Sequence, residues 1–538
     1  MLYGENKTAG PVASPGRSGR AGSLFRGAAL TGLMALVLAG CGGGGGSAGA
    51  TLPASAGQSP AATPAPLPPD IIESSARSAN MCVAPRTGID RYTGKAYPDR
   101  PGILEQEKSW VRAWIDETYL WYDEIPSTIR SFTYASPQSL FNDLRTTTLT
   151  PSGKPRDRFH FIYDTAVWQA LSQSGIEAGY GFELAIIKPQ VPREVRVAYT
   201  EPGTPAASAG IGRGARIVGV DGIDIVLNPS VDAMNAALFP AAAGQSHSFT
   251  LQELDGSVRT VVLVSAEVTK VPVQNVRAID TATGKVGYLL FNDHIATSEA
   301  QLVAAMTQLK AQGVQDLVLD LRYNGGGLLA IASELAFMIA GPQATTGKVF
   351  EKLEFNRKNP FQLTDADTIT PFYSRSLGFS GTADQPLPQL GLSRVTVLTG
   401  PGTCSASESI INGLRGVNVE VNLIGNGTCG KPYGFLPQDN CGTTYFAIQF
   451  KGVNSQGFGD YADGIAPTCV VADDFSRALS DPAEARLSAA LGYRATGTCP
   501  PVVTAVSKAA VPGTGEALQS GKSPGRTGRF LRSGALRP

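Results

Sequence analysis

The sequence predicts a multi-domain α/β protein, and three observations carry that prediction. The chain has 538 residues, which is more than one domain usually holds. Hydrophobic residues make up 42% and charged residues 17%, proportions that are typical of folded globular proteins. From about residue 271 onward, strand-like and helix-like segments alternate, and this alternation indicates a mostly parallel sheet covered by helices.

The predicted sheet comes from short apolar runs, and the predicted helices come from the segments between them. Strands are expected at 286–291, 316–321, 395–398 and 421–424. Helices are expected at 328–339, at 405–414 and after Ser298, where Ser-Glu-Ala-Gln fits a capping box. The stretch 350–392 interrupts the alternation and is expected to be an insertion or a loop that faces substrate.

Composition excludes two classes of function. Basic and acidic side chains are equal in number, 45 of each, but both ends of the chain are basic, so the part between them is net acidic. This balance argues against a nucleic-acid partner. The chain has only three histidines, and they are scattered, so a histidine-rich metal site is not expected. We expect neither a metal nor an organic cofactor.

Residues 1–40 are expected to be a signal peptide. Three arginines precede the apolar run 27–40, which is too short to span a bilayer. The run ends in Leu38-Ala39-Gly40-Cys41, which resembles a lipoprotein signal with Cys41 as the lipidated residue. The alternatives are an ordinary secretory signal or a buried helix. Residues 41–75 are rich in Gly, Ser and Pro, as a tether would be. The expected location is the bacterial cell envelope, lipid-anchored and facing the periplasm, with the outer membrane favoured.

Seven cysteines are present, and six remain once Cys41 is set aside. An even number in an exported chain favours disulfides, and six cysteines allow fifteen pairings. Short spacing suggests the local pairs Cys429–Cys441 and Cys469–Cys499. No CxxC motif occurs, so neither a zinc ribbon nor a thioredoxin-type site is indicated.

Two modules are expected before the sheet. Residues 80–170 are predicted to form an N-terminal helical module, because tryptophans recur at near-helical spacing within 103–123; we expect them to pack in a core. Residues 175–269 resemble a PDZ domain of the bacterial protease type, with the loop Gly179-Tyr180-Gly181-Phe182, the strand 195–199 and the strand and turn 214–222. In such a domain Gly181 and Phe182 would receive a peptide carboxylate, and a strand edge would accept the peptide backbone. The alternative is a β-rich spacer that binds nothing.

Three segments of the predicted sheet carry residues suited to chemistry. Ser405 lies at a strand-to-helix turn, where helix N–H groups can stabilise an oxyanion. Lys431 follows the next strand, so both residues should lie at the same edge of the sheet, where a desolvated lysine can act as a general base. The run Gly325-Gly326-Gly327 follows a third strand and can present backbone N–H groups.

These motifs, with a PDZ-like unit before them, resemble the C-terminal processing peptidases, also called tail-specific proteases. The resemblance implies a crotonase/ClpP-like α/β catalytic core over residues 271–499, with Ser405 as nucleophile and Lys431 as general base. It also implies an oxyanion hole made by the N–H groups of Ala406 and Gly326.

The sequence departs from the family pattern beside the lysine. Better-known members carry a lysine-orienting glutamine four residues after it, where this chain has Phe435. Gln438 is the expected substitute, the alternative being a bare dyad. Cys404 and Cys429 flank the two catalytic candidates, and they are expected either to form a disulfide that clamps the site or to be small buried residues.

The sequence therefore predicts an exported serine endopeptidase that acts on unfolded or C-terminally presented polypeptides. Its other expected partner is the membrane, through the lipid anchor. One alternative is a catalytically silent PDZ-containing adaptor, because Phe435 replaces the lysine-orienting glutamine. Another alternative is a structural lipoprotein. Residues 500–538 are expected to form a disordered basic tail.

Overall fold

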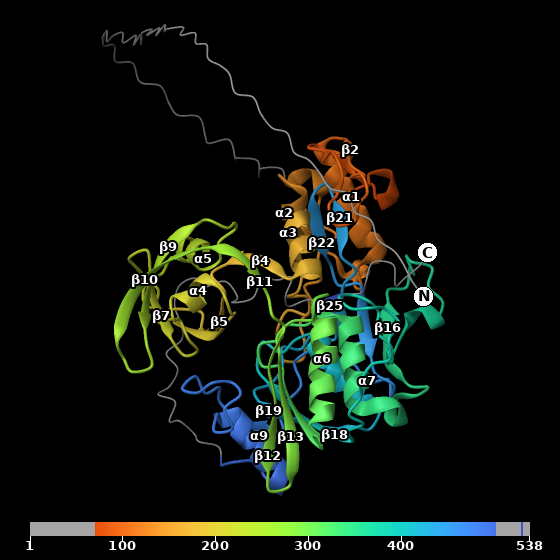
Figure 1. The fold of residues 1–538 in the computed structure, drawn as a ribbon. Coiled ribbons are helices and arrows are strands. Elements are labelled where there is room, and N and C mark those ends of the chain that lie inside the picture. Colours follow the sequence, from red (N-terminus) through yellow and green to blue (C-terminus); the bar gives the residue numbers. More distant parts are fainter. Residues whose placement is uncertain (1–69, 502–528, 531–538) are drawn as a thin grey trace, which may run out of the picture. The chain divides into compact units, whose positions relative to one another are not determined.

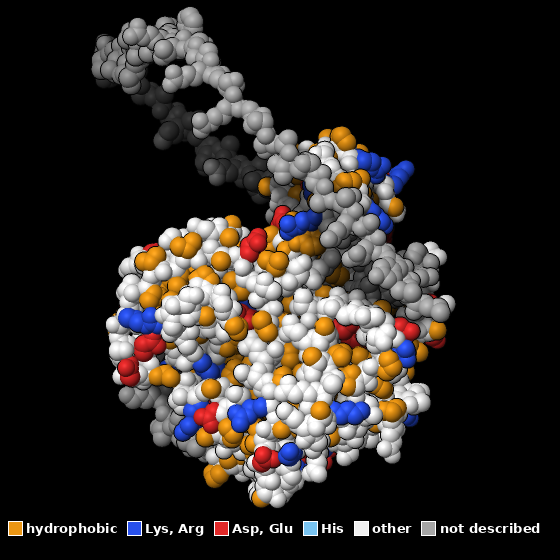
Figure 2. Space-filling model, in the orientation of Figure 1, with side chains coloured by type: hydrophobic (Ala, Val, Ile, Leu, Met, Phe, Trp, Pro, Cys, Tyr) orange, Lys and Arg blue, Asp and Glu red, His pale blue; other side chains and the backbone are white. Residues whose placement is uncertain are grey.

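The computed structural model describes residues 70–501 and Arg529–Phe530. The predicted signal peptide, Cys41 and nearly all of the predicted tether lie outside these residues, as does most of the predicted basic tail. None of the helices in the described part is long and apolar enough to cross a bilayer. On the face drawn in Figure 2, basic and acidic side chains are mixed among neutral and hydrophobic ones, in keeping with their equal numbers.

A six-stranded sheet forms the centre of the region after residue 271, with strand order β12-β13-β14-β18-β19-β24 (Figure 1). β12 and β13 are antiparallel, and every later pair is parallel. The strands are β12 (Val273–Thr281), β13 (Gly284–Phe291), β14 (Asp316–Asp320), β18 (Arg394–Thr399), β19 (Glu420–Gly425) and β24 (Cys469–Val470). The predicted α/β fold with a mostly parallel sheet is confirmed.

Helices α6 and α7 lie side by side on one face of this sheet (Figure 1). The helices of the region are α6 (Ser298–Ala311), α7 (Leu329–Thr345), α8 (Ala406–Gly416) and α9 (Ala485–Thr496). Buried aliphatic side chains of α6, α7 and α8 form one core with β13, β14 and β18. The predicted capping box at Ser298 is wrong, because Thr297 is the N-cap and Ser298 Oγ donates to the carbonyl of Asp293.

The stretch 350–392 is only partly an insertion, since it supplies strands to a second sheet. This sheet has the order β17-β16-β23-β20, with β16 (Val349–Phe355), β17 (Ile369–Pro371), β20 (Tyr433–Gly434) and β23 (Phe450–Val453). β20 begins two residues after Lys431, so this sheet continues directly from the lysine loop.

The N-terminal region packs on the segment that follows the lysine. Its helices are α1 (Leu104–Thr118), α2 (Pro137–Asp143) and α3 (Thr165–Gln169), and its strands are β1 (Met81–Cys82), β2 (Arg100–Pro101) and β3 (Phe161–Asp164). β3 pairs with β22 (Thr443–Phe446), which also pairs with β21 (Gln438–Asn440). Trp110 and Trp114 are buried and stacked, so the core role expected of them is confirmed. The sequence gives no sign of the pairing between β3 and β22.

Residues 175–269 form a second, antiparallel unit. Its sheet has the order β10-β9-β7-β6-β5, with β8 paired to β7, so β5 is an edge strand. The elements are β4 (Ile176–Gly179), β5 (Phe182–Lys188), β6 (Glu194–Thr200), β7 (Arg216–Val220), β8 (Ile223–Asp224), β9 (Ser246–Gln252), β10 (Val258–Val264), β11 (Ala266–Thr269), α4 (Pro205–Ser208) and α5 (Asp232–Leu238). β4 and β11 pair with each other where the chain enters and leaves the unit.

Three disulfides join the six cysteines of the described region: Cys82–Cys441, Cys404–Cys429 and Cys469–Cys499. The suggested pair Cys469–Cys499 is present. The suggested pair Cys429–Cys441 is wrong, because the fold brings Cys441 beside Cys82, which stands 359 residues earlier. Sequence spacing could not reveal a contact of that range.

Candidate active site

Ser405 occupies a sharp turn between β18 and α8. Its backbone has φ 60° and ψ −114°, in the positive-φ region that non-glycine residues rarely adopt. The side chain is fully buried, and its Oγ has no hydrogen-bond partner among the described residues. Backbone strain and an unpaired buried hydroxyl both carry a cost in stability, and such features cluster at functional sites.

The N-terminus of α8 lies directly after this serine. Ala406 is the first helical residue, so its N–H has no acceptor within the helix. The helix dipole adds positive potential at the same point. This geometry suits the stabilisation of a negative charge that develops next to Ser405.

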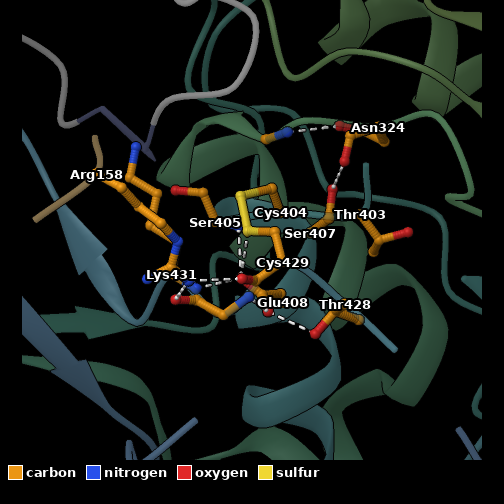
Figure 3. Close-up of a disulfide and its surroundings, with 12 residues drawn as sticks. Arg158, Asn324, Thr403, Cys404, Ser405, Ser407, Glu408, Thr428, Cys429 and Lys431 are labelled. Atoms are coloured by element: carbon orange, nitrogen blue, oxygen red, sulfur yellow. Dashed lines mark hydrogen bonds between the residues drawn. A yellow bond between two sulfur atoms is a disulfide. The ribbon is translucent and has the colours of Figure 1, made fainter. Parts of the chain in front are cut away.

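Lys431 lies on the loop that follows β19, the strand next to β18 in the sheet. The two strands are parallel, so Ser405 and Lys431 follow the same edge of the sheet, as predicted. Lys431 is buried, with its Nζ 3.9 Å from the ring centre of Phe435 and 4.9 Å from that of Phe159. Figure 3 shows Ser405 and Lys431 in one small group of side chains.

The carboxylate of Glu408 connects the backbones of these two residues. Its Oε2 accepts from the N–H of Ser405 at 2.9 Å and from the N–H of Lys431 at 2.8 Å. Its Oε1 accepts from Thr428 Oγ1 at 2.6 Å and from the N–H of Gly430 at 2.8 Å (Figure 3). Burial raises the pKa of Glu408, and the four hydrogen bonds act in the opposite direction. Glu408 is therefore a structural carboxylate that joins the serine turn to the lysine loop.

The disulfide Cys404–Cys429 joins the same two segments covalently (Figure 3). Its Cα atoms are 5.1 Å apart, and the N–H of Cys429 donates to the carbonyl of Thr403 at 3.0 Å. The expected clamp is thus present. These two cysteines and Glu408 form a compact group, but sulfurs in a disulfide offer no thiolate to a metal.

The glycine loop 325–327, which follows β14, does not present the N–H of Gly326 as expected. The N–H of Gly326 donates to Asn324 Oδ1 at 2.9 Å, so in this conformation it is engaged within its own loop. This placement does not fit the oxyanion role expected of Gly326. The carbonyl of Asn324 accepts from the N–H of Cys404 and from Ser407 Oγ, which ties the glycine loop to the serine turn.

The strand β15 (Gly327–Leu328) continues this loop, and another part of the chain pairs with it. β25 (Arg529–Phe530) runs parallel to β15 with Gly327 opposite Arg529, and it also contacts β20. The strand that follows the glycine loop and the strand that follows Lys431 therefore both touch one extended segment. Backbone groups at this edge accept an extended chain.

The sequence candidate Gln438 and the buried Arg322 both lie outside this group. Gln438 is exposed, and its amide donates to the carbonyl of Asp439, which does not fit the lysine-orienting role expected of it. Arg322 is fully buried and pairs with Asp320, Asp473 and Glu484. That network makes Arg322 a structural residue.

The loop at Gly181 leads into the edge strand β5. Gly181 has φ 90°, and a Cβ there would lie 2.2 Å from the side chain of Thr204, so only glycine fits. A cavity of about 930 Å³ is lined by Leu184 and Ile186 of β5 and by Gly400 and Gly402 of the loop before Ser405. A peptide on the β5 edge would thus lie beside a cavity that reaches the loop carrying the serine.

Sequence reasoning missed Phe159, Arg158 and Thr428. Phe159 and Arg158 come from the N-terminal region and contact the lysine loop. Arg158 and its partner Cys429 are 271 residues apart in the sequence. No local motif signals such a contact. In the sequence, Glu408 could be recognised only as an acidic residue in the first turn of a helix.

Comparison of the sequence with known protein families gives two matches. Residues 285–469 match peptidase family S41, and residues 106–161 match the peptidase S41 N-terminal domain. A carboxyl-terminal-processing protease of Picosynechococcus sp. is 30% identical over 269 residues, which are 48% of this chain and 56% of the relative. A chloroplastic C-terminal processing peptidase of Tetradesmus obliquus is 28% identical over 237 residues, 41% of this chain and 45% of the relative. The chain spans about half the length of these relatives.

The fold has a solved counterpart. A Bacteroides fragilis protein assigned to the S41 proteases superimposes with a TM-score of 0.55 at 24% identity, covering 75% of this chain and all of the other. At this identity the likeness concerns the fold alone. It agrees with the multi-domain α/β architecture described above.

Proposed function

We propose, from the premise that this chain belongs to the S41 family of C-terminal processing serine peptidases, that it is an endopeptidase with a Ser-Lys dyad. The observation that carries the proposal is the shared anchor of the two residues, since Glu408 Oε2 accepts the N–H of both Ser405 and Lys431. Polypeptides with unfolded or exposed C-terminal ends are the proposed substrates.

In the proposed reaction, Lys431 Nζ takes the proton of Ser405 Oγ as that oxygen attacks the peptide carbonyl. The N–H of Ala406 and the N-terminus of α8 stabilise the resulting oxyanion. The C–N bond then breaks, and the proton passes from Lys431 to the leaving amine. Water, activated by the same lysine, hydrolyses the acyl ester and restores Ser405. No metal enters these steps.

Substrate selection is proposed to begin at the antiparallel unit. Gly181 and Phe182 would receive the C-terminal carboxylate, and the edge of β5 would pair with the peptide backbone. The cavity lined by residues of β5 and by Gly400–Gly402 supports this assignment, because the second of these segments leads into the serine turn. Recognition of backbone and carboxylate implies broad sequence specificity.

We also propose that the protein is exported and anchored by lipid at Cys41 in the bacterial cell envelope, facing the periplasm. Three disulfides among the described residues support export, because such bonds persist in oxidising compartments.

The test compares the full chain with Ser405→Ala and Lys431→Ala on an unfolded protein substrate and on a fluorophosphonate probe. Matched controls are Ser488→Ala, an exposed serine on α9, and Lys451→Ala, a lysine paired with Asp460. Both dyad variants should lose cleavage by at least about 10³-fold with folding intact, and the controls should keep it. Absence of both cleavage and probe labelling in the parent would instead favour the catalytically silent peptide-binding adaptor. The reason to consider this alternative is that Phe435 stands where better-known members carry the lysine-orienting glutamine.

A further inference from the structure

The N-terminal region contributes two neighbouring residues to the surroundings of Lys431. Phe159 places its ring centre 4.9 Å from Lys431 Nζ. Arg158 donates from Nη2 to the carbonyl of Cys429 at 2.8 Å and to that of Gly430 at 3.2 Å. Both residues precede β3, far from the catalytic motifs in sequence.

We propose that Arg158 and Phe159 are positioning residues for Lys431, so that the peptidase site is complete only when the N-terminal region is docked on the core. This inference rests on the proposed role of Lys431 as general base. It assigns a distinct task to each residue: Arg158 fixes the backbone of the lysine loop, and Phe159 confines the amine.

The guanidinium of Arg158 binds carbonyls from two separate loops. Besides Cys429 and Gly430, Nη2 donates to the carbonyl of Ala462 at 3.1 Å, while Nη1 donates to that of Pro155. Desolvation lowers the pKa of Arg158, and the nearby charge of Glu408 acts against that effect. A planar fork of donors suits such converging carbonyls, whereas a lysine presents a single point charge. The loop is thus held through its N–H groups by Glu408 and through its carbonyls by Arg158.

The ring of Phe159 forms one wall of a slot, and Phe435 forms another. The Nζ of Lys431 lies 3.9 Å from the centre of the Phe435 ring, within the range of a cation–π contact. An aromatic ring offers no hydrogen-bond acceptor of the kind a glutamine would, so at this side the amine is oriented by packing. Two rings also keep water from this part of the side chain.

A buried network fixes the segment that carries both residues. Asp157 accepts from Tyr119 Oη at 2.6 Å and from the N–H of Phe159 at 3.0 Å, and His160 Nδ1 lies 2.8 Å from the same carboxylate. Burial acts to raise the pKa of Asp157, but these three partners outweigh it and the pKa lies below its ordinary value. Because Tyr119 directly follows α1, the position of Phe159 depends on the N-terminal helix.

The experiment measures Arg158→Ala and Phe159→Ala in the full chain against the control Arg156→Ala. Arg156 lies in the same segment, but it pairs with Glu124 and stacks on Trp121 instead of reaching the lysine loop. We expect kcat and the rate of Ser405 labelling by a fluorophosphonate to fall about 10- to 100-fold in the two test variants, with KM changed less than about threefold. The control should stay within about threefold of the parent in all three quantities.

A second measurement does not depend on activity. Hydrogen–deuterium exchange of residues 427–433 should become faster in Arg158→Ala and remain at the parent rate in Arg156→Ala. Partial recovery of kcat is expected in Arg158→Lys, which can reach one carbonyl, and in Phe159→Leu, which keeps an apolar wall. These conservative variants also serve if an alanine variant does not fold.

Unchanged kcat, labelling and exchange in folded Arg158→Ala and Phe159→Ala would overturn the proposal. An equal loss in Arg156→Ala would do the same, because it would indicate general destabilisation of the segment. If the parent neither cleaves nor reacts with the probe, the proposed function fails, and the exchange measurement alone decides whether Arg158 holds the loop.

Discussion

Ser405 and Lys431 donate their backbone N–H groups to the same oxygen atom, Glu408 Oε2, over 2.9 and 2.8 Å. A single buried carboxylate therefore sets the separation between the candidate nucleophile and the candidate base. It does so through the backbone, which leaves both side chains available for chemistry. The arrangement makes the geometry of the dyad depend on a residue that need not touch substrate.

Replacing Glu408 with Gln keeps the shape of the side chain but should disrupt the hydrogen bonds that position Ser405 and Lys431. The amide would place an NH₂ group where one carboxylate oxygen now accepts two hydrogen bonds, either from the N–H groups of Ser405 and Lys431 or from Thr428 Oγ1 and the N–H of Gly430. Buried donors left unpaired cost about 1–3 kcal/mol each, so we expect a loss of about 2–4 kcal/mol in the free energy of unfolding. We also expect kcat to fall about 10- to 100-fold. Urea unfolding and steady-state kinetics measure the two effects.

Glu420→Gln is the matched control, because Glu420 is an exposed residue at the start of β19 that pairs with Asn422. It should leave both quantities close to those of the parent. A Glu408→Gln enzyme with parental kcat would show that the carboxylate does not set the dyad geometry.

The disulfide Cys404–Cys429 should matter to activity in a way that Cys469–Cys499 does not. The two bonds close loops of similar length, with sequence separations of 25 and 30, so removing either should cost about 3 kcal/mol of stability. Only the first bond joins the serine turn to the lysine loop. We expect Cys404→Ser/Cys429→Ser to lower kcat, and Cys469→Ser/Cys499→Ser to retain it at a temperature where both variants are folded. Equal effects on kcat would contradict this distinction.

The sequence predicted the elements whose signal is local. Apolar runs located β13, β14, β18 and β19, because a strand buried on both faces of a sheet must be apolar throughout. The same order of strands and helices placed Ser405 and Lys431 at one edge. The first helical residues were harder to predict, as Ser298 shows, because capping depends on side-chain direction.

Contacts between distant segments could not be predicted in this way. The pairing of β3 with β22, the disulfide Cys82–Cys441 and the approach of Phe159 to Lys431 all depend on how the N-terminal region docks. The engagement of the Gly326 N–H by Asn324 is a matter of loop conformation, which a motif does not specify. Residue types at the site were thus predictable, whereas their fine geometry was not.

Glu334 gives a prediction for pH. Its carboxyl group is buried on α7 beside Glu299, and burial together with the charge of Glu299 raises the pKa of Glu334 to about 8. A folded pKa above the unfolded value means that the folded state binds the proton more tightly. The stabilisation is fully present below about pH 4.5 and is lost as pH rises through about 8. Glu334→Gln should therefore flatten the fall in stability between pH 5 and 8, by about 2–4 kcal/mol.

Urea unfolding at intervals from pH 5 to 9 measures this effect. Glu354→Gln, at an exposed carboxylate on β16, is the control and should leave the pH dependence unchanged. Parallel curves for the parent and Glu334→Gln would show that Glu334 is ionised in the folded state across this range.

The pairing of β25 with β15 predicts that the chain's own C-terminal segment competes with substrate. Arg529–Phe530 lies along Gly327–Leu328 and contacts β20, the strand that follows Lys431. A substrate that binds this edge must displace it, so a chain ending at residue 528 should show a lower KM with kcat unchanged. A chain ending at residue 530, which keeps β25, is the control and should retain the parental KM. Identical KM values for the two truncated chains would show that the pairing does not limit access to the site.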